Sequence, residues 1–200
     1  AYNSRLATVI TKAKAANMPN DNIKRVLEKA ASAGQGDSYE SITYEGHGPS
    51  GVAVIVETMT DNRNRTAADI RHYFDKCGGN MGTTGCVSFM FADKGVIVVD
   101  GKSVADEDRF MEDVMECGAI DFTGDDGIFE VFTDPSELSG VRDALAAKGY
   151  VFLSAEPEKI PNTYVRLDDE EQRAKMSKLL GLLEDNDDVQ NVWHNWEDDE

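Results

Sequence analysis

The sequence predicts an α+β fold, with an N-terminal helical hairpin or small bundle followed by two small ferredoxin-like α+β domains, one inserted in the other. Three observations predict this architecture. Apolar residues recur with helical spacing over the first 33 residues. From Glu40 onward, β-branched residues gather in short runs that are typical of strands. From residue 94 to 162 the expected elements follow the order of the split βαβ motif.

The first segment predicts two helices. One apolar stripe precedes the sequence "NMPN", where Asn17 can end a helix and Pro19 or Asn20 can start the next one. Residues 1–36 are therefore predicted to be a helical domain. Because the chain starts at Ala1 within a helical pattern, we expect this domain to lack its N-terminal part. The two stripes comprise Leu6, Val9, Ile10 and Ala13, then Ile23, Val26, Leu27 and Ala30.

The next domain is predicted from residues 40–92 together with 163–200. "SITYEG" and "GVAVIVETM" are expected strands, a helix with a capping-box-like start at Thr66 and a stop at Gly78 follows, and "CVSFMFA" is expected to be the next strand. Near the C-terminus come "NTYVRL", a helix over Asp168–Leu183 and "DVQNVWHNW". These last elements have no partners of their own, so we infer that they complete the first sheet.

The inserted domain is predicted over residues 94–162. "GVIVVD" is an expected strand, and "ADEDRFMEDVMECG" is an amphipathic helix. "AIDFTGD" and "GIFEVFTD" form a hairpin around an Asp125–Gly127 turn. The helix "PSELSGVRDALAAKG" and the strand "YVFLSAEP" complete the βαββαβ order.

The charge of the chain is strongly acidic and unevenly distributed. The net charge is −18, yet residues 1–83 hold ten Lys and Arg against nine Asp and Glu. The rest of the chain would repel a polyanion, so any phosphate contact is expected in the first third. The three cysteines show no close pairing, which favours a reducing cytoplasm. No run approaches 18 apolar residues, so we expect no membrane-spanning segment.

No pattern of catalytic or metal-binding residues stands out. The glycine-rich "GGNMGTTG" follows a helix and precedes a strand, the opposite of the order in phosphate-binding loops. "DFTGDDGIFE" lacks the glycine and the glutamate that a calcium loop needs. His47, His72 and His194 show no zinc spacing with the cysteines. The sequence therefore predicts a non-enzymatic protein without cofactor, metal or small-molecule substrate.

The remaining candidates are cations. Arg63 and Arg65 lie at or just before the N-terminal end of a predicted helix, where a positive charge is mildly unfavourable. Two explanations stay open: a phosphate binds there, or a carboxylate from elsewhere in the chain occupies the position. The predicted nucleic-acid-binding residues are Lys12, Lys14, Lys24, Arg25, Lys29, Arg63, Arg65 and Arg71.

Two segments carry a resemblance to a known family. "KAKAANMPNDNIKRVLEKA" and the longer stretch from Ile42 to Phe91, "ITYEGHGPSGVAVIVETMTDNRNRTAADIRHYFDKCGGNMGTTGCVSFMF", closely resemble the YebC/PmpR family. That resemblance implies a helical domain plus two α+β domains, one inserted in the other. Family members usually begin with a basic helical stretch that this chain lacks.

The resemblance implies regulation of gene expression rather than catalysis. The first interpretation is a DNA-binding transcriptional regulator, because bacterial members are described in this way. The alternative is a ribosome- or RNA-binding translation factor, as implied by the mitochondrial relatives. In either case we expect a cytoplasmic monomer whose partner is DNA, or ribosomal RNA and the ribosome.

Overall fold

The computed structural model describes residues 6, 9–10, 13–14, 17–32, 39–125 and 127–197. The chain divides into two compact units, Ala1–Glu40 and Ser41–Glu200. Helices and mainly antiparallel sheets are combined in the second unit, so the predicted α+β class is confirmed. The division into three domains stays a prediction.

The first unit contains helix α2, Asn20–Ser32. Asn17 adopts a left-handed backbone conformation with φ of 59°, which agrees with its expected role at a helix end. The predicted apolar stripe is only partly internal, because Ile23 is buried whereas Val26 is 62% exposed. The described residues between 6 and 14 are helical, but the predicted pairing of two helices extends outside the described residues.

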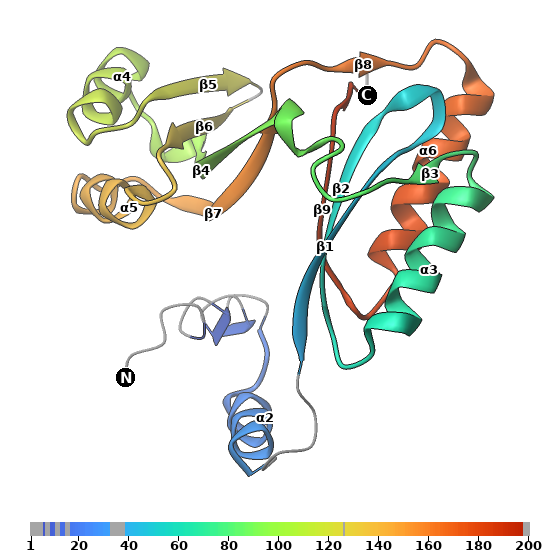
Figure 1. The fold of residues 1–200 in the computed structure, drawn as a ribbon. Helices are drawn as coiled ribbons and strands as arrows, with labels where there is room; N and C mark the ends of the chain where they lie inside the picture. Colours follow the sequence, from blue (N-terminus) through green and yellow to red (C-terminus); the bar gives the residue numbers. More distant parts are fainter. Residues whose placement is uncertain are drawn as a thin grey trace. The chain divides into compact units, whose positions relative to one another are not determined.

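The first sheet has the strand order β3-β1-β2-β9. Strand β9 pairs antiparallel with β2 although more than 130 residues separate them, so the C-terminal segment does join this sheet. Helices α3 and α6 lie side by side on one face (Figure 1). The elements are β1 (Glu40–His47), β2 (Ala53–Thr60), α3 (Arg63–Lys76), β3 (Asn80–Met81), α6 (Glu170–Glu184) and β9 (Val189–His194). A short parallel pair, β8 (Val165–Arg166) and β10 (Trp196–Glu197), lies beside them.

An apolar core fills the space between this sheet and its two helices. Alternate residues of β2 point toward the helices, and the residues between them are buried in a smaller cluster on the other face. Val54, Ile70 and Phe74 are completely buried there, together with Met176 and Leu179 of α6. This packing fixes the position of α3, whose N-terminal end carries the candidate arginines.

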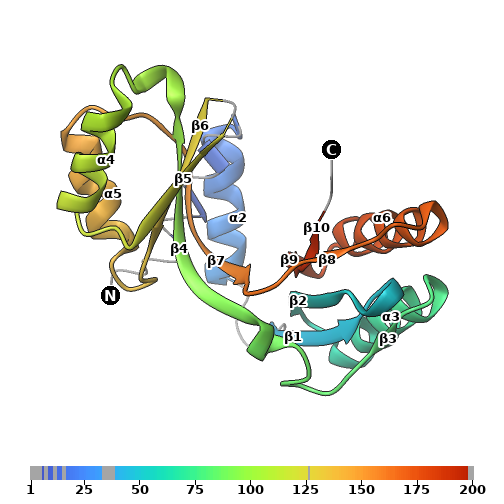
Figure 2. The ribbon, with the colours of Figure 1, turned by 90° about the horizontal axis from the view of Figure 1, so that it is seen from above.

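The second sheet has the order β5-β6-β4-β7 and is antiparallel throughout. Its chain order, β4-α4-β5-β6-α5-β7, is that of the split βαβ motif. Helices α4 and α5 lie on the same face of the sheet (Figure 2). The elements are β4 (Phe91–Asp100), α4 (Glu107–Glu116), β5 (Asp121–Asp125), β6 (Ile128–Thr133), α5 (Leu138–Ala147) and β7 (Phe152–Pro161).

One expected strand is absent as such. The sequence predicted "CVSFMFA" as a strand separate from "GVIVVD". In the structure Ser88–Met90 forms a short 3-10 turn, and a single strand, β4, starts at Phe91 and continues to Asp100. The reason is long-range pairing: β4 is matched with β7 from Phe91 opposite Pro161 to Val99 opposite Phe152.

Candidate nucleic-acid interface

The cations of the N-terminal unit are only partly described. Lys14, Lys24 and Arg25 are exposed, and the Lys24 ammonium lies 3.9 Å from the carboxylate of Glu28 one helical turn later. At this exposure such a pair contributes little to stability. Lys12 lies outside the described residues, and Lys29 belongs to α2 with a side chain that is also outside them.

The N-terminal end of α3 is built by local capping. Asn62 is the N-cap of the helix, and its side-chain oxygen accepts a hydrogen bond from the backbone N–H of Arg65 at 3.1 Å. This satisfies one of the amide groups that a helix start leaves unpaired. The Asn62 N–H in turn donates to the Thr60 hydroxyl at 2.9 Å. The Asn62 side chain therefore caps the helix.

A carboxylate from a distant segment also occupies this helix end. Asp188, in the turn before β9, accepts a hydrogen bond from the Thr66 hydroxyl at 2.6 Å and another from Thr60 at 3.2 Å. The Arg65 guanidinium donates to both of its oxygens, at 2.9 and 3.1 Å. These hydrogen bonds, led by that from Thr66, lower the pKa of the Asp188 carboxyl despite its partial burial.

Arg65 therefore forms ion pairs within the fold. Its guanidinium also bonds Asp61 at 3.0 Å, so two carboxylates share one cation. The hydrogen bond and charge of Asp188, followed by those of Asp61, raise the pKa of Arg65. The structure thus realises for Arg65 the second explanation considered above, a carboxylate of the chain itself. The charge of Arg65 is matched by Asp61 and Asp188.

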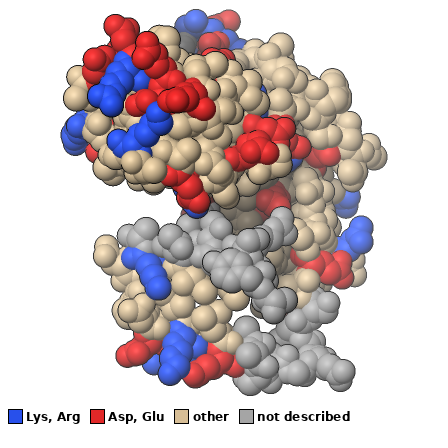
Figure 3. Space-filling model, turned by 90° about the vertical axis from the view of Figure 1, so that its left-hand side faces the viewer, with Lys and Arg blue, Asp and Glu red and all other residues tan. Residues whose placement is uncertain are grey.

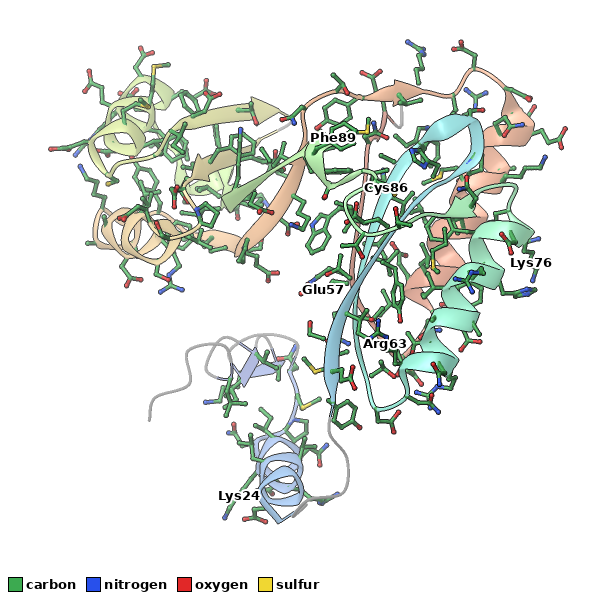
Figure 4. The ribbon with its side chains drawn as sticks, viewed as in Figure 1. Lys24, Glu57, Arg63, Lys76, Cys86 and Phe89 are labelled. Atoms are coloured by element: carbon green, nitrogen blue, oxygen red, sulfur yellow. The ribbon has the colours of Figure 1, made fainter. Side chains whose placement is uncertain are left out.

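Arg63 and Arg71 differ from Arg65. Both are exposed on α3, and neither makes an ion pair with a carboxylate among the described residues. Figure 4 shows Arg63 at the N-terminal end of the helix and Lys76 at the opposite end. Arg63 and Arg71 are therefore the candidate cations of α3 whose guanidinium groups make no ion pair among the described residues.

The amide groups of the glycine-rich loop after α3 are also bound by a carboxylate of the chain itself. The backbone N–H groups of Gly85, Val87 and Ser88 all donate to the carboxylate of Glu45, at 2.7 to 2.9 Å. Glu45 is 4% exposed, and burial alone would raise its pKa, but these hydrogen bonds outweigh burial and lower it. The loop does form an anion-binding arrangement of amides, and its anion is a side chain of β1.

The sequence offered little signal for Glu45 and Asp188. Both are single acidic residues in an acidic chain, and their partners lie 40 to 43 and 122 to 128 positions away along the chain. Within β1, Glu45 shares one face with the polar residues Thr43 and His47, so no local pattern indicates that it is buried.

No group of three or more His, Cys, Asp or Glu side chains in the described part of the chain could hold a metal ion. Within the same residues, no helix is long and apolar enough to cross a membrane.

Comparison with known proteins gives consistent matches over nearly the whole chain. Residues 39–196 match a family profile described as the second and third domain of TACO1/YebC. A "probable transcriptional regulatory protein" of Caldicellulosiruptor bescii is 55% identical over 99% of this chain and 81% of its own length. A protein of the same description from Clostridioides difficile is 54% identical over 98% of this chain and 82% of its own length.

A solved structure supports the fold. The crystal structure of a conserved hypothetical protein from Aquifex aeolicus is similar with a TM-score of 0.86 and 43% sequence identity. The match covers 98% of this chain and 80% of that chain.

Proposed function

Since the chain belongs to the TACO1/YebC family, which is the YebC/PmpR family that its sequence resembles, we propose that it is a transcriptional regulator that binds DNA. The observation that carries the proposal is the description of relatives more than 50% identical as probable transcriptional regulatory proteins. None of the relatives named above is described by a role in translation, so the ribosome-binding alternative is not favoured.

The proposed contacts are phosphate contacts. Lys14, Lys24 and Arg25 of the first unit and Arg63 and Arg71 of α3 present exposed cations in the least acidic third of the chain. Such contacts give affinity and position without reading the sequence of bases. Arg65 is left out of the proposed set, because Asp61 and Asp188 already neutralise it.

The proposal is tested by a double charge reversal, Arg63→Glu with Arg71→Glu, in duplex-DNA binding at several salt concentrations. We expect affinity to fall at least about tenfold and the log–log salt slope to decrease by about two, because two phosphate contacts are lost. The matched control is Lys102→Glu with Arg142→Glu, which changes the net charge equally on the inserted part. Equal losses in both variants, or no binding of duplex DNA by the unaltered chain, would contradict the proposal.

A further inference from the structure

Helix α4 buries one side and leaves an apolar flank exposed. Phe110 and Val114 are completely buried in the core between the second sheet and its two helices. Met111 and Met115 each follow one of them by one residue and are 46% and 52% exposed. Because residues four apart lie one above the other on a helix, the two methionine side chains form one short apolar ridge.

The methionine ridge faces away from α5, the other helix on this face of the sheet. With about 100° of rotation per residue, the ridge lies on the flank of α4 opposite to Asp113. The Asp113 carboxylate is directed toward α5, because it accepts hydrogen bonds from Lys148 and Tyr150, which follow that helix. On the ridge's side of α4 lies β5, the edge strand of the second sheet.

Ile120 extends this apolar surface to the start of β5. Its backbone N–H donates to the carbonyl of Phe132, so the pairing of β5 with β6 continues to this residue. Phe122, two residues later, packs against the core beneath α4, and strand alternation places Ile120 on the same face of the sheet. Ile120 is 59% exposed. We call Met111, Met115 and Ile120 the methionine surface.

Carboxylates border the methionine surface. Glu107 and Asp108 precede Met111 by four and three residues. Glu112 precedes Met115 by three residues, so each of these carboxylates lies beside the ridge. All three are exposed, and none forms an ion pair with a lysine or arginine of the described residues. The helix dipole explains acidic residues in the first turn of α4, but Glu112 stands in the middle of the helix, where the dipole has no such effect.

The charge and the shape of this surface define the class of partner. Residues 106–116 include six acidic residues and one basic residue, so the surface attracts cations and repels both phosphate and a second copy of itself. Figure 3 shows that Asp and Glu also gather on the side of the molecule that carries α4 and α5. A ridge of residues four apart fits a groove between the ridges of another helix, and methionine side chains adapt to the shape of an apolar partner.

We propose that the methionine surface is a docking site for a basic amphipathic helix of a partner protein. That helix places apolar residues at i, i+3 and i+4 against the ridge of α4. Lysine or arginine residues beside its apolar stripe meet the carboxylates of Glu107, Asp108 and Glu112. The proposal does not depend on DNA binding, because none of the proposed phosphate-binding cations takes part in it.

The experiment measures binding of a fluorescein-labelled peptide to the full chain by fluorescence anisotropy. The peptide repeats the unit Lys-Leu-Ala-Lys-Lys-Leu-Ala, which gathers leucine on one face of a helix. A shuffled peptide of the same composition, whose leucines do not share a face, measures attraction by charge alone. The methionine variant combines Met111→Ser and Met115→Ser. Its control combines Val151→Ser and Leu153→Ser, which removes two exposed apolar side chains elsewhere in the inserted part.

We expect the methionine variant to lose at least about tenfold in affinity and the control less than about twofold, because only the former removes apolar surface that binding buries. Glu112→Gln should weaken binding about threefold, whereas Glu137→Gln, an exposed change next to α5, should leave it unchanged. Thermal unfolding verifies that each variant is folded.

Three results would overturn the proposal: equal losses in the methionine variant and its control, equal binding of the shuffled peptide, or no binding of the helical peptide by the unaltered chain. Sedimentation of the chain alone tests a second copy as the occupant. We expect the unaltered chain and the methionine variant to sediment alike, and a dimer that only the variant dissociates would also overturn the proposal.

Discussion

Two regions of the molecule use their carboxylates in opposite ways. The first region is the sheet β3-β1-β2-β9 with helices α3 and α6, and the inserted region is the sheet β5-β6-β4-β7 with helices α4 and α5. In the first region, Glu45 and Asp188 turn inward and gather hydrogen-bond donors from segments far away in the sequence. In the inserted region, Glu130 is exposed on the face of the second sheet opposite α4 and α5. The same residue type therefore builds the fold in one region and shapes the surface potential in the other.

This difference explains why net charge alone is a poor guide to the binding site. Two arrangements in the first region have the form of phosphate sites, the amides of the glycine-rich loop and the start of α3. Glu45 already serves the first and Asp188 lies at the second. Hence the anion that these groups favour is part of the chain, whereas Arg63 makes no ion pair among the described residues.

Replacing Glu45 by alanine should have the largest effect on the first region. Three backbone N–H groups would lose a charged acceptor in a buried setting, which costs about 3 kcal/mol of unfolding free energy. Urea denaturation followed by circular dichroism measures the loss.

The contrast between the two regions would be wrong if Glu130→Ala in the inserted region lowered the unfolding free energy as much as Glu45→Ala does. Exposed positions without special contacts change stability by less than about 0.5 kcal/mol. Glu45→Gln is the conservative companion, because its amide oxygen keeps one acceptor while the charge is lost. The unfolding free energy of Glu45→Gln should lie between those of Glu45→Ala and Glu130→Ala.

Asp188→Asn should be the next largest change. The amide can still accept from the Thr66 hydroxyl, but it loses the charge that pairs with Arg65, so we expect a destabilisation of about 1–2 kcal/mol. The neighbouring exposed Asp187→Asn is the control and should be nearly neutral. Chemical denaturation measures the unfolding free energy of both variants. Equal values would mean that the Asp188 contacts contribute nothing beyond the general acidity of the turn.

Much of the fold was predictable because its signals are local. The continuous β-branched apolar run of β2 and the helical spacing of Ile70 and Phe74 can be recognised in the sequence without knowledge of the tertiary fold. The continuity of β4 could not be predicted in this way. It depends on pairing with β7, some 50 to 70 residues later, and local sequence does not encode that register.

The candidate site was predictable to a smaller extent. The sequence placed Arg63 and Arg65 at or just before a helix start, which is confirmed, but the capping pattern at Thr66 was wrong: Asn62 is the N-cap and the helix starts at Arg63. Their different environments were not predictable, because Asp188 reaches Arg65 only after β9 has paired with β2. An ion pair between residues 123 positions apart is a consequence of the tertiary fold.

The inward carboxylates also predict an acid-sensitive first region. Both have folded-state pKa values lowered from 4.5 for Glu45 and 3.8 for Asp188. A lowered pKa contributes stability above the ordinary value, and this contribution is lost as the pH falls through the folded-state value. The melting temperature of Glu45→Gln should therefore fall less than that of the unaltered chain between about pH 6 and pH 3. Parallel curves would contradict this assignment.

Asp113 gives the test with the smallest expected effect on the contrast between the two regions. It is a carboxylate of the inserted region that accepts hydrogen bonds from within the fold. It accepts hydrogen bonds from Lys148 at 2.6 Å and from the Tyr150 hydroxyl at 2.7 Å, joining α4 to the segment after α5. Burial, followed by this hydrogen bond, raises the pKa of Tyr150 from 10.0 to about 12. Since folding favours the protonated phenol, this contribution is present below the ordinary value and is lost as the pH rises toward the folded-state value.

Asp113→Asn should lower the Tyr150 pKa only part of the way toward 10.0, because burial, the larger cause, remains. Ultraviolet absorbance of tyrosinate during an alkaline titration, with Tyr150→Phe subtracted to isolate this residue, measures the change. A complete return to the ordinary value would mean that the carboxylate, and not the core, dominates. The inserted region would then resemble the first in its dependence on internal carboxylates.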